Sequence, residues 1–184
     1  TKGEIIGYLP QHIASNLLDI TTSDYFYSKI DFNTLDYNLL YRLLGQMKLN
    51  EDRISNSLRI SNLSGGEKIK FQILCEMMNQ PSIFLLDEPS NDLDLESIQW
   101  LEDFINSLAI PLIFISHDER LLENCSNGII HIEQLMRKKV SSYTIERLPY
   151  KEYVKNRINK IDKQTQQARK DKEIFDNKMD RYRK

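Results

Sequence analysis

An acidic pair directly follows a short apolar run in the middle of the chain. Asp87 and Glu88 come immediately after Ile83-Phe84-Leu85-Leu86, an uninterrupted apolar run that predicts a buried parallel strand. Ligands gather at the carboxyl ends of such strands, and carboxylates are costly to bury there unless a cation or a reaction uses them. Asp87 can hold Mg²⁺, and Glu88 can accept a proton from a water that attacks phosphorus. The alternative is a solvated acidic loop, which the following Pro-Ser-Asn-Asp-Leu-Asp disfavours.

A serine and two glycines open a predicted helix earlier in the chain. Ser64, Gly65 and Gly66 precede Glu67 and a run of apolar residues at helical spacing. Exposed backbone N–H groups, a hydroxyl and the positive end of the helix dipole would suit an anionic phosphate here. The alternative is plain helix capping by Ser64, with the glycines serving the turn.

Two further polar residues follow predicted strands. His117 lies in Ser116-His117-Asp118, after the apolar run 112–115, and can donate to a phosphate oxygen or position an attacking water. Gln11 follows the strand predicted over residues 4–9 and can ligate Mg²⁺ or water. A lone histidine is more often a structural residue, and Gln11 by itself carries little information.

The elements that position these residues predict an α/β fold. Apolar runs predict strands over residues 4–9, 83–86, 112–115 and 128–132, with helices between the last three, so we expect a parallel-rich sheet covered on both faces. Residues 15–62 read as a helical layer that includes a helix over residues 34–48, capped by Asp31 or Asn33. With the helix that Ser64 opens, this helical subdomain covers about residues 15–80.

The charge distribution separates a body from a tail. The 184 residues carry a net charge of −2, but residues 151–184 contain 12 Lys and Arg against 6 Asp and Glu. Apolar residues recur there at heptad spacing from Val154 to Tyr182, interrupted by Thr165 and Lys172. We therefore expect a domain over residues 1–149 and the start of a helical linker over 150–184, as one arm of an antiparallel hairpin. A solvated helix, or one packed on its own domain, is the alternative.

Composition excludes several classes of protein. Hydrophobic residues make up 40% and charged residues 28%, a globular balance, and the longest uncharged apolar runs have the length of strands. Cys75 and Cys125 are far apart and lack metal-binding spacing, so they indicate reduced thiols. With no secretory signal and no membrane segment, the expected location is cytoplasmic.

Together these segments resemble the ATP-binding cassette family. The resemblance rests on YLPQ, LSGGEK, IFLLDE, SNDLD and SHD, which match the Q-loop, the signature loop, the Walker B strand with its catalytic acid, the D-loop and the histidine switch. It implies ATP and Mg²⁺ as cofactors, with Asp87 and Gln11 at the metal and Glu88 and His117 catalytic. It also implies nucleotide contacts from Gln11, Ser64, Gly65, Gly66, Glu67 and Asp94. In this family two cassettes close head to tail, and each signature loop contacts the nucleotide of the other cassette.

One motif of the family is missing from these residues. The phosphate loop needs Gly-Lys within G-x-x-x-x-G-K-[ST], and no glycine of this chain is followed by lysine. The expectation is a truncated cassette whose phosphate loop would precede Thr1. Such a fragment would bind ATP weakly or not at all.

The order of the segments resembles the first cassette of an ABC-F protein. Such proteins join two cassettes through a long charged helical hairpin, and the stretch Tyr143–Tyr153 resembles the entry to that linker. The resemblance implies ATP-dependent binding to the ribosome, with a role in translation or in protection from antibiotics, and a second cassette as partner. The Pro-Ser-Asn-Asp-Leu-Asp stretch departs from the more usual Thr-Asn-His form. A transporter ATPase, an SMC-type ATPase half and a non-catalytic scaffold are the alternatives.

Overall fold

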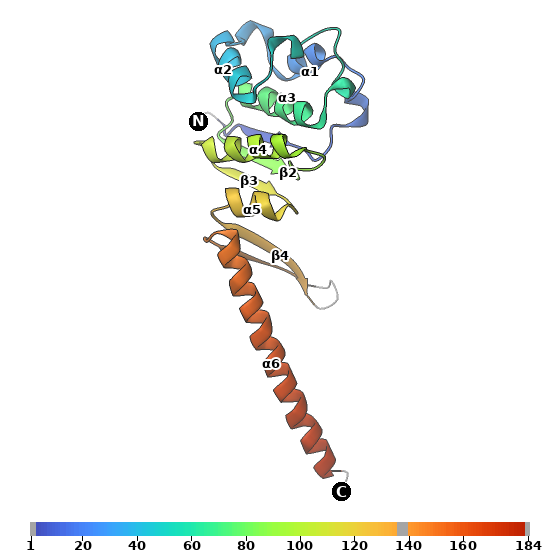
Figure 1. The fold of residues 1–184 in the computed structure, drawn as a ribbon, viewed down its shortest axis with the longest axis vertical. Helices are drawn as coiled ribbons and strands as arrows, with labels where there is room; N and C mark the ends of the chain where they lie inside the picture. Colours follow the sequence, from blue (N-terminus) through green and yellow to red (C-terminus); the bar gives the residue numbers. More distant parts are fainter. Residues whose placement is uncertain (1–2, 136–139, 183–184) are drawn as a thin grey trace. The chain divides into compact units, whose positions relative to one another are not determined.

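The computed structural model describes residues 3–135 and 140–182 (Figure 1). The chain divides into two compact units, Thr1–Cys125 and Ser126–Lys184, which are described separately below. All the predicted site residues lie in the first unit, and the long basic helix lies in the second. The predicted boundary at residue 149/150 coincides with the start of that helix, and its reading as a domain boundary stays a prediction.

The first unit is built on a three-stranded parallel sheet. Its strands are β1 (Ile6–Leu9), β2 (Ile83–Asp87) and β3 (Leu112–Ile115), in the order β1-β2-β3. The register pairs Leu9 with Leu86, and Asp87 with Ile115. The carboxyl ends of all three strands therefore meet at one edge, which confirms the α/β fold and brings the segments after each strand together.

The described part of the first unit covers only one face of this sheet. Leu9, Phe84 and Leu86 are buried in the core, whereas the alternate side chains along the strands are exposed. The exposed set is Ile6, Tyr8, Ile113 and Ile115, each with 48–60% of its surface accessible. The expectation of helices on both faces is therefore wrong for this chain, because side chains alternate between the two faces of a strand and only one set meets the core.

A helical layer precedes the signature segment, as the sequence predicted. It contains α1 (Thr22–Lys29) and α2 (Tyr37–Met47) and four short 3₁₀ turns. The cap of the second helix differs from the prediction: Leu39 N donates to Asp36 Oδ1 at 3.1 Å, while Asp31 caps the 3₁₀ turn at Phe32–Thr34. The reason is that Leu35 adopts an extended conformation, which separates that turn from α2.

Three further helices complete the first unit. They are α3 (Gly65–Met78), α4 (Leu95–Ser107) and α5 (Glu119–Cys125). Trp100 on α4 donates from Nε1 to the Gln46 carbonyl at 3.0 Å and stacks on Phe104, so α4 is fixed to α2. The fully buried side chains of the core come from every layer of the unit: Phe26, Met47, Ile60, Phe71, Ile73, Leu74, Phe84, Leu101 and Leu121.

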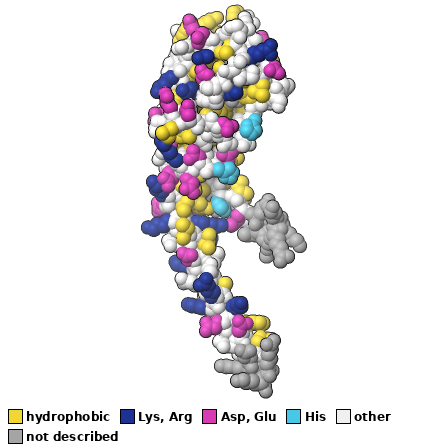
Figure 2. All heavy atoms as spheres, turned by 45° about the vertical axis from the view of Figure 1, so that its right-hand side comes forward, with side chains coloured by type: hydrophobic (Ala, Val, Ile, Leu, Met, Phe, Trp, Pro, Cys, Tyr) yellow, Lys and Arg dark blue, Asp and Glu magenta, His cyan; other side chains and the backbone are white. Residues whose placement is uncertain are grey.

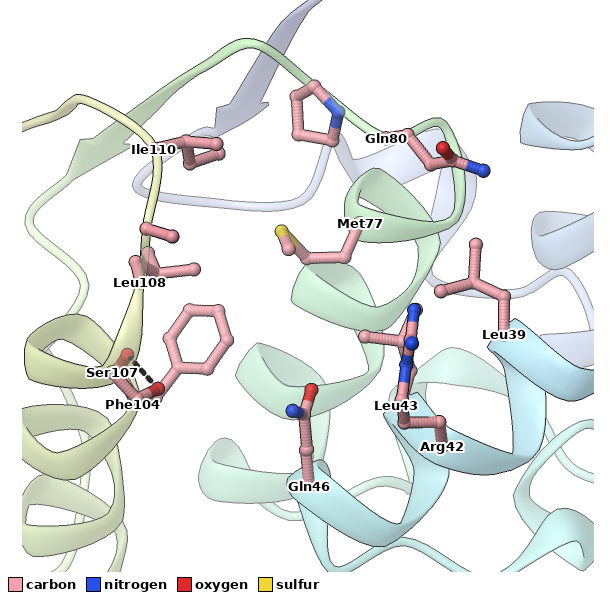
Figure 3. A pocket seen from close by; sticks show the side chains of 12 residues that line it. Leu39, Arg42, Leu43, Gln46, Met77, Gln80, Phe104, Ser107, Leu108 and Ile110 are labelled. Carbon is pink, nitrogen blue, oxygen red and sulfur yellow. Dashed lines mark hydrogen bonds between the residues drawn. The ribbon is translucent and has the colours of Figure 1, made fainter.

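A cavity of about 410 Å³ lies among α2, α3 and α4. Figure 3 shows Met77 of α3 projecting into it, with Phe104 of α4 on one side and Leu39 of α2 on the other. Pro81 and Ile110, which precede β2 and β3, also line it. The cavity therefore lies where the strands begin, and none of the predicted site residues lines it.

The second unit contains a β-hairpin and one long helix. β4 (Ile129–Leu135) pairs antiparallel with β5 (Val140–Glu146). The sequence predicted the first strand, over residues 128–132, and missed the second, although Tyr143 and Ile145 alternate with polar residues at the spacing of a strand. The predicted strand belongs to this separate two-stranded sheet.

Helix α6 (Tyr150–Tyr182) confirms the predicted long basic helix. Tyr153 is buried against the His131 ring, at 5.8 Å between ring centroids, and Arg157 pairs with Glu133. Beyond this contact these apolar side chains of the heptad pattern are exposed: Ile158, Ile161, Phe175 and Met179. Figure 2 shows Lys and Arg side chains along this helix with acidic and apolar side chains between them. A paired coiled coil stays a prediction.

Every helix in residues 3–135 and 140–182 is too short or too polar to cross a membrane.

Candidate functional site

The acidic pair lies at the carboxyl edge of the parallel sheet. Asp87 ends β2, and Tyr8 Oη of the neighbouring strand donates to Asp87 Oδ2 at 3.5 Å. Glu88 is only 7% exposed, and its backbone N donates to the Ile115 carbonyl at 2.9 Å. Its φ of 48° lies in the left-handed region, which costs a non-glycine residue about 1 kcal/mol or more. The surrounding structure thus holds a buried carboxylate in a strained position beside the strand ends.

His117 contacts both carboxylate oxygens of Glu88. The backbone N of His117 donates to Oε2 at 3.1 Å, and His117 Nε2 lies 3.3 Å from Oε1. The imidazole itself is 96% exposed, so it reaches the solvent while its backbone holds Glu88. The sequence named both residues as catalytic without linking them. The pair can orient a water molecule and accept its proton at Glu88.

Two serines connect the loops that carry these residues. The hydroxyls of Ser90 and Ser116 lie 3.3 Å apart, and Ser116 Oγ also accepts from Asp118 N at 3.0 Å. Asp118 in turn caps α5, because its Oδ1 accepts from Arg120 N at 2.9 Å. Sequence reasoning did not assign roles to Ser90 and Ser116; their position in loops after neighbouring parallel strands was the available signal.

Ser64 and Glu67 form a capping box at the start of α3. Glu67 N donates to Ser64 Oγ at 3.2 Å, and Ser64 N donates to Glu67 Oε2 at 2.9 Å. Arg53 Nη2 lies 3.0 Å from Glu67 Oε1 and adds an ion pair. The capping interpretation of Ser64 is therefore confirmed. The backbone N–H groups of the first helical turn have no carbonyl partner within the helix, so a capped terminus can still bind an anion.

The two glycines of the signature segment are packed against the segment that follows Glu88. A Cβ on Gly65 would lie 2.7 Å from the Asp92 carbonyl oxygen, and one on Gly66 would lie 2.1 Å from Ser97 Oγ. Asp94 caps α4 by accepting from Ser97 N at 2.8 Å, and hydrogen bonding from the side chain and the backbone of Ser97 lowers the pKa of Asp94. The N-termini of α3 and α4 therefore lie side by side.

Gln11 lies at the same edge of the sheet, two residues beyond Leu9, and its side chain is exposed. Among the described residues there is no group of three or more His, Cys, Asp or Glu side chains that could hold a metal by themselves. The Asp87 carboxylate and the Gln11 amide are nonetheless oxygen donors of the kind that Mg²⁺ takes together with substrate phosphates. The donor set thus fits a magnesium ion that arrives with a nucleotide.

We expect Glu67→Gln to make the stability of the chain less dependent on pH in the acidic range. Hydrogen bonding from Ser64, with Arg53 nearby, lowers the pKa of Glu67 below its usual 4.5. A lowered pKa contributes stability above 4.5, and that contribution is lost as the pH falls through the lower folded value. Urea unfolding at neutral pH and below 4.5 checks this: the wild type should lose its advantage over Glu67→Gln in acid. A constant difference between the two proteins would contradict it.

Comparison with known proteins agrees with this geometry. The model of the family described as ABC transporter matches residues 2–91, which include the signature segment and the acidic pair. The ATP-binding protein Uup of Buchnera aphidicola is 32% identical over 164 residues, 86% of this chain. The chain belongs to the ATP-binding cassette family. The Uup match covers 26% of that relative's length, and a partial cassette fits this match.

Other relatives of this cassette carry names from translation. Elongation factor 3 of Pneumocystis carinii is 46% identical over 84 residues, 45% of this chain and 8% of that protein. The energy-dependent translational throttle protein EttA of Escherichia coli is 37% identical over 76 residues, 41% of this chain and 14% of that protein. These relatives and Uup are ABC-F proteins. The cassette spans about a quarter or less of the length of each of them.

A solved structure shares the fold. An archaeal ribosome recycling factor, crystallised with an archaeal ribosomal stalk protein, superposes with a TM-score of 0.62 at 23% identity. The superposition covers 88% of this chain and 31% of that one. At this level of identity the match establishes the fold of the cassette and nothing about its partners.

Proposed function

We propose that this cassette belongs to an ATP hydrolase whose active sites form between two cassettes. The observation that carries the proposal is the buried Glu88 carboxylate, held by His117 at the carboxyl edge of the parallel sheet. In the proposed reaction a water molecule attacks the γ-phosphorus and gives its proton to Glu88. The bond between this phosphorus and the bridging oxygen breaks, and ADP leaves.

The remaining site residues have distinct proposed roles. Asp87 and Gln11 would hold Mg²⁺, which neutralises charge on the phosphates. The first turn of α3, with Ser64, Gly65 and Gly66, would contact the γ-phosphate of a nucleotide on the second cassette. We place the phosphate loop outside these 184 residues, because none of their glycines is followed by lysine. This chain by itself should then bind Mg-ATP weakly, which isothermal titration can measure.

We further propose that the full-length protein acts on the ribosome, in translation or in protection from ribosome-targeting antibiotics. Two observations support this: the relatives named for translation, and the excess of Lys and Arg in residues 151–184, which suits contact with RNA phosphates. In this proposal ATP binding closes the two cassettes and favours the ribosome-bound state, and hydrolysis releases the protein.

Ser64→Arg in the full-length protein tests the paired-cassette site. Arginine would add bulk and charge at the terminus that must approach the second cassette, so ATP turnover should fall by about 100-fold, as when a group that stabilises a transition state is lost. Ser28→Arg, at an exposed position of α1, is the matched control and should hydrolyse ATP normally. In the presence of ATP, less of the Ser64→Arg protein should sediment with ribosomes, whereas the amount of the Ser28→Arg protein should be unchanged. Normal hydrolysis by Ser64→Arg would exclude an active site formed between two cassettes.

A further inference from the structure

An ion pair between a buried carboxylate and a half-exposed guanidinium joins α4 to α5, outside the residues assigned so far. Glu102 on α4 is 3% exposed, and its Oε1 accepts from Arg120 Nε at 2.9 Å and from Asn124 Nδ2 at 3.0 Å. Arg120 Nη2 also donates to Gln99 Oε1 at 2.8 Å. A buried carboxylate is costly without partners, so this network ties α5 firmly to α4.

The ion pair lies directly beside the loop that carries His117. Arg120 is in the first turn of α5, and its backbone N donates to Asp118 Oδ1 at 2.9 Å. Asp118 N donates to Ser116 Oγ, so the loop and the start of the helix form one hydrogen-bonded segment. The position of that helix therefore determines where the backbone of residues 116–118 lies.

Helix α5 depends on such an anchor. It has seven residues, too few for a helix that is stable without tertiary contacts. Leu121 anchors it in the core, and the Arg120 guanidinium fixes its first turn to α4. The His117 imidazole is 96% exposed, so packing around the ring cannot hold it against Glu88. Its placement rests on the backbone of this loop.

We propose that Arg120, through Glu102, is a positioning residue that holds His117 in contact with Glu88. The inference deepens the proposed function and rests on it for its catalytic meaning, whereas the contact itself can be measured without ATP. Loss of the guanidinium would release the first turn of α5 from α4, and the backbone N and the imidazole of His117 would move away from the Glu88 carboxylate.

The test compares NMR signals of the His117 ring in the 184-residue chain and its variants. Glu88→Gln removes the carboxylate, and the chemical-shift change that it causes in the His117 ring is the reference. Arg120→Ala should show most of that change in chemical shift, and Arg120→Lys, which keeps a cation near Glu102, should show less. Asn106→Ala is the matched control: Asn106 Nδ2 donates to the Asn124 carbonyl at 3.3 Å, between the same two helices but far from the loop, and the His117 signals should not move.

The outcomes separate positioning from stability and from the proposed function. If Arg120→Ala lowers the melting temperature but leaves the His117 signals unchanged, the positioning role is excluded. Should Arg120→Ala fail to fold, Glu102→Gln, which keeps the shape and removes the charge, replaces it. In the full-length protein, Arg120→Ala should lower kcat by about 10-fold or more with an unchanged KM for ATP, since small misplacements of reacting groups are costly. If Glu88→Gln leaves hydrolysis intact, the proposed function fails while the NMR comparison still decides the contact.

Discussion

Glu88→Gln in the full-length protein is expected to lower ATP turnover by about 100- to 10,000-fold, the range that a positioned general base contributes. The carboxamide has the shape of the carboxylate, and its oxygen can still accept from His117 N, but it cannot take a proton from the attacking water. Turnover under single- and multiple-turnover conditions measures the loss. ATP binding should be retained, because the change removes no contact that we assign to the nucleotide.

The same variant should accumulate with ribosomes in the presence of ATP. If hydrolysis triggers release, a protein that binds ATP and cannot hydrolyse it stays in the bound state, and sedimentation should recover more of it in the ribosome fraction than of the wild type. Glu96→Gln, at an exposed position in the first turn of α4, is the matched control. Undiminished hydrolysis by Glu88→Gln would remove Glu88 from its proposed role.

Gly65→Ala is expected to destabilise the chain by about 1–3 kcal/mol, the cost of adding a methyl group to a filled space. The new Cβ would lie 2.7 Å from the Asp92 carbonyl oxygen, which is backbone and cannot rotate away. Asp92 itself has a φ of 59°, so its backbone has little freedom to adjust. The N-terminus of α3 would have to separate from the loop before α4. The midpoint of urea unfolding measures the effect.

Gly45→Ala provides the opposite result at a second helical glycine. A Cβ on Gly45 meets nothing within 4 Å, and alanine favours the helix by about 1 kcal/mol over glycine, so α2 should become more stable. The two variants make the same chemical change and should shift the unfolding midpoint in opposite directions. Equal stabilisation by both would show that Gly65 is not confined by Asp92.

Local signals in the sequence were sufficient for several parts of the site. The apolar run before Asp87 identified β2, and Ser64 with the two glycines that follow it identified the start of α3. Both signals depend on hydrogen bonds and burial within a few neighbouring residues. The same reasoning misplaced the cap of α2, because Asp31 and Asp36 are both good capping residues and only the extended backbone of Leu35 selects the second.

Contacts between distant residues were beyond such signals. Glu88 and His117 are 29 positions apart, and Glu102 and Arg120 are 18 positions apart. Nothing in the residue types specifies that these side chains meet, because the pairing depends on the parallel order of β2 and β3 and on the packing of α5 against α4. The role of the two signature glycines in close helix packing likewise required the position of residues 92–97.

The sequence by itself determined which functional groups are available: an acid pair after a strand, a capped glycine-rich helix start and a histidine after the next strand. Spacing and hydrogen-bonding capacity within short segments encode these features. The tertiary structure alone decided that Glu88 is buried and held at both oxygens by His117, that the starts of α3 and α4 touch, and that one face of the sheet stays exposed. These outcomes follow from how distant strands and helices pack, which no single segment specifies.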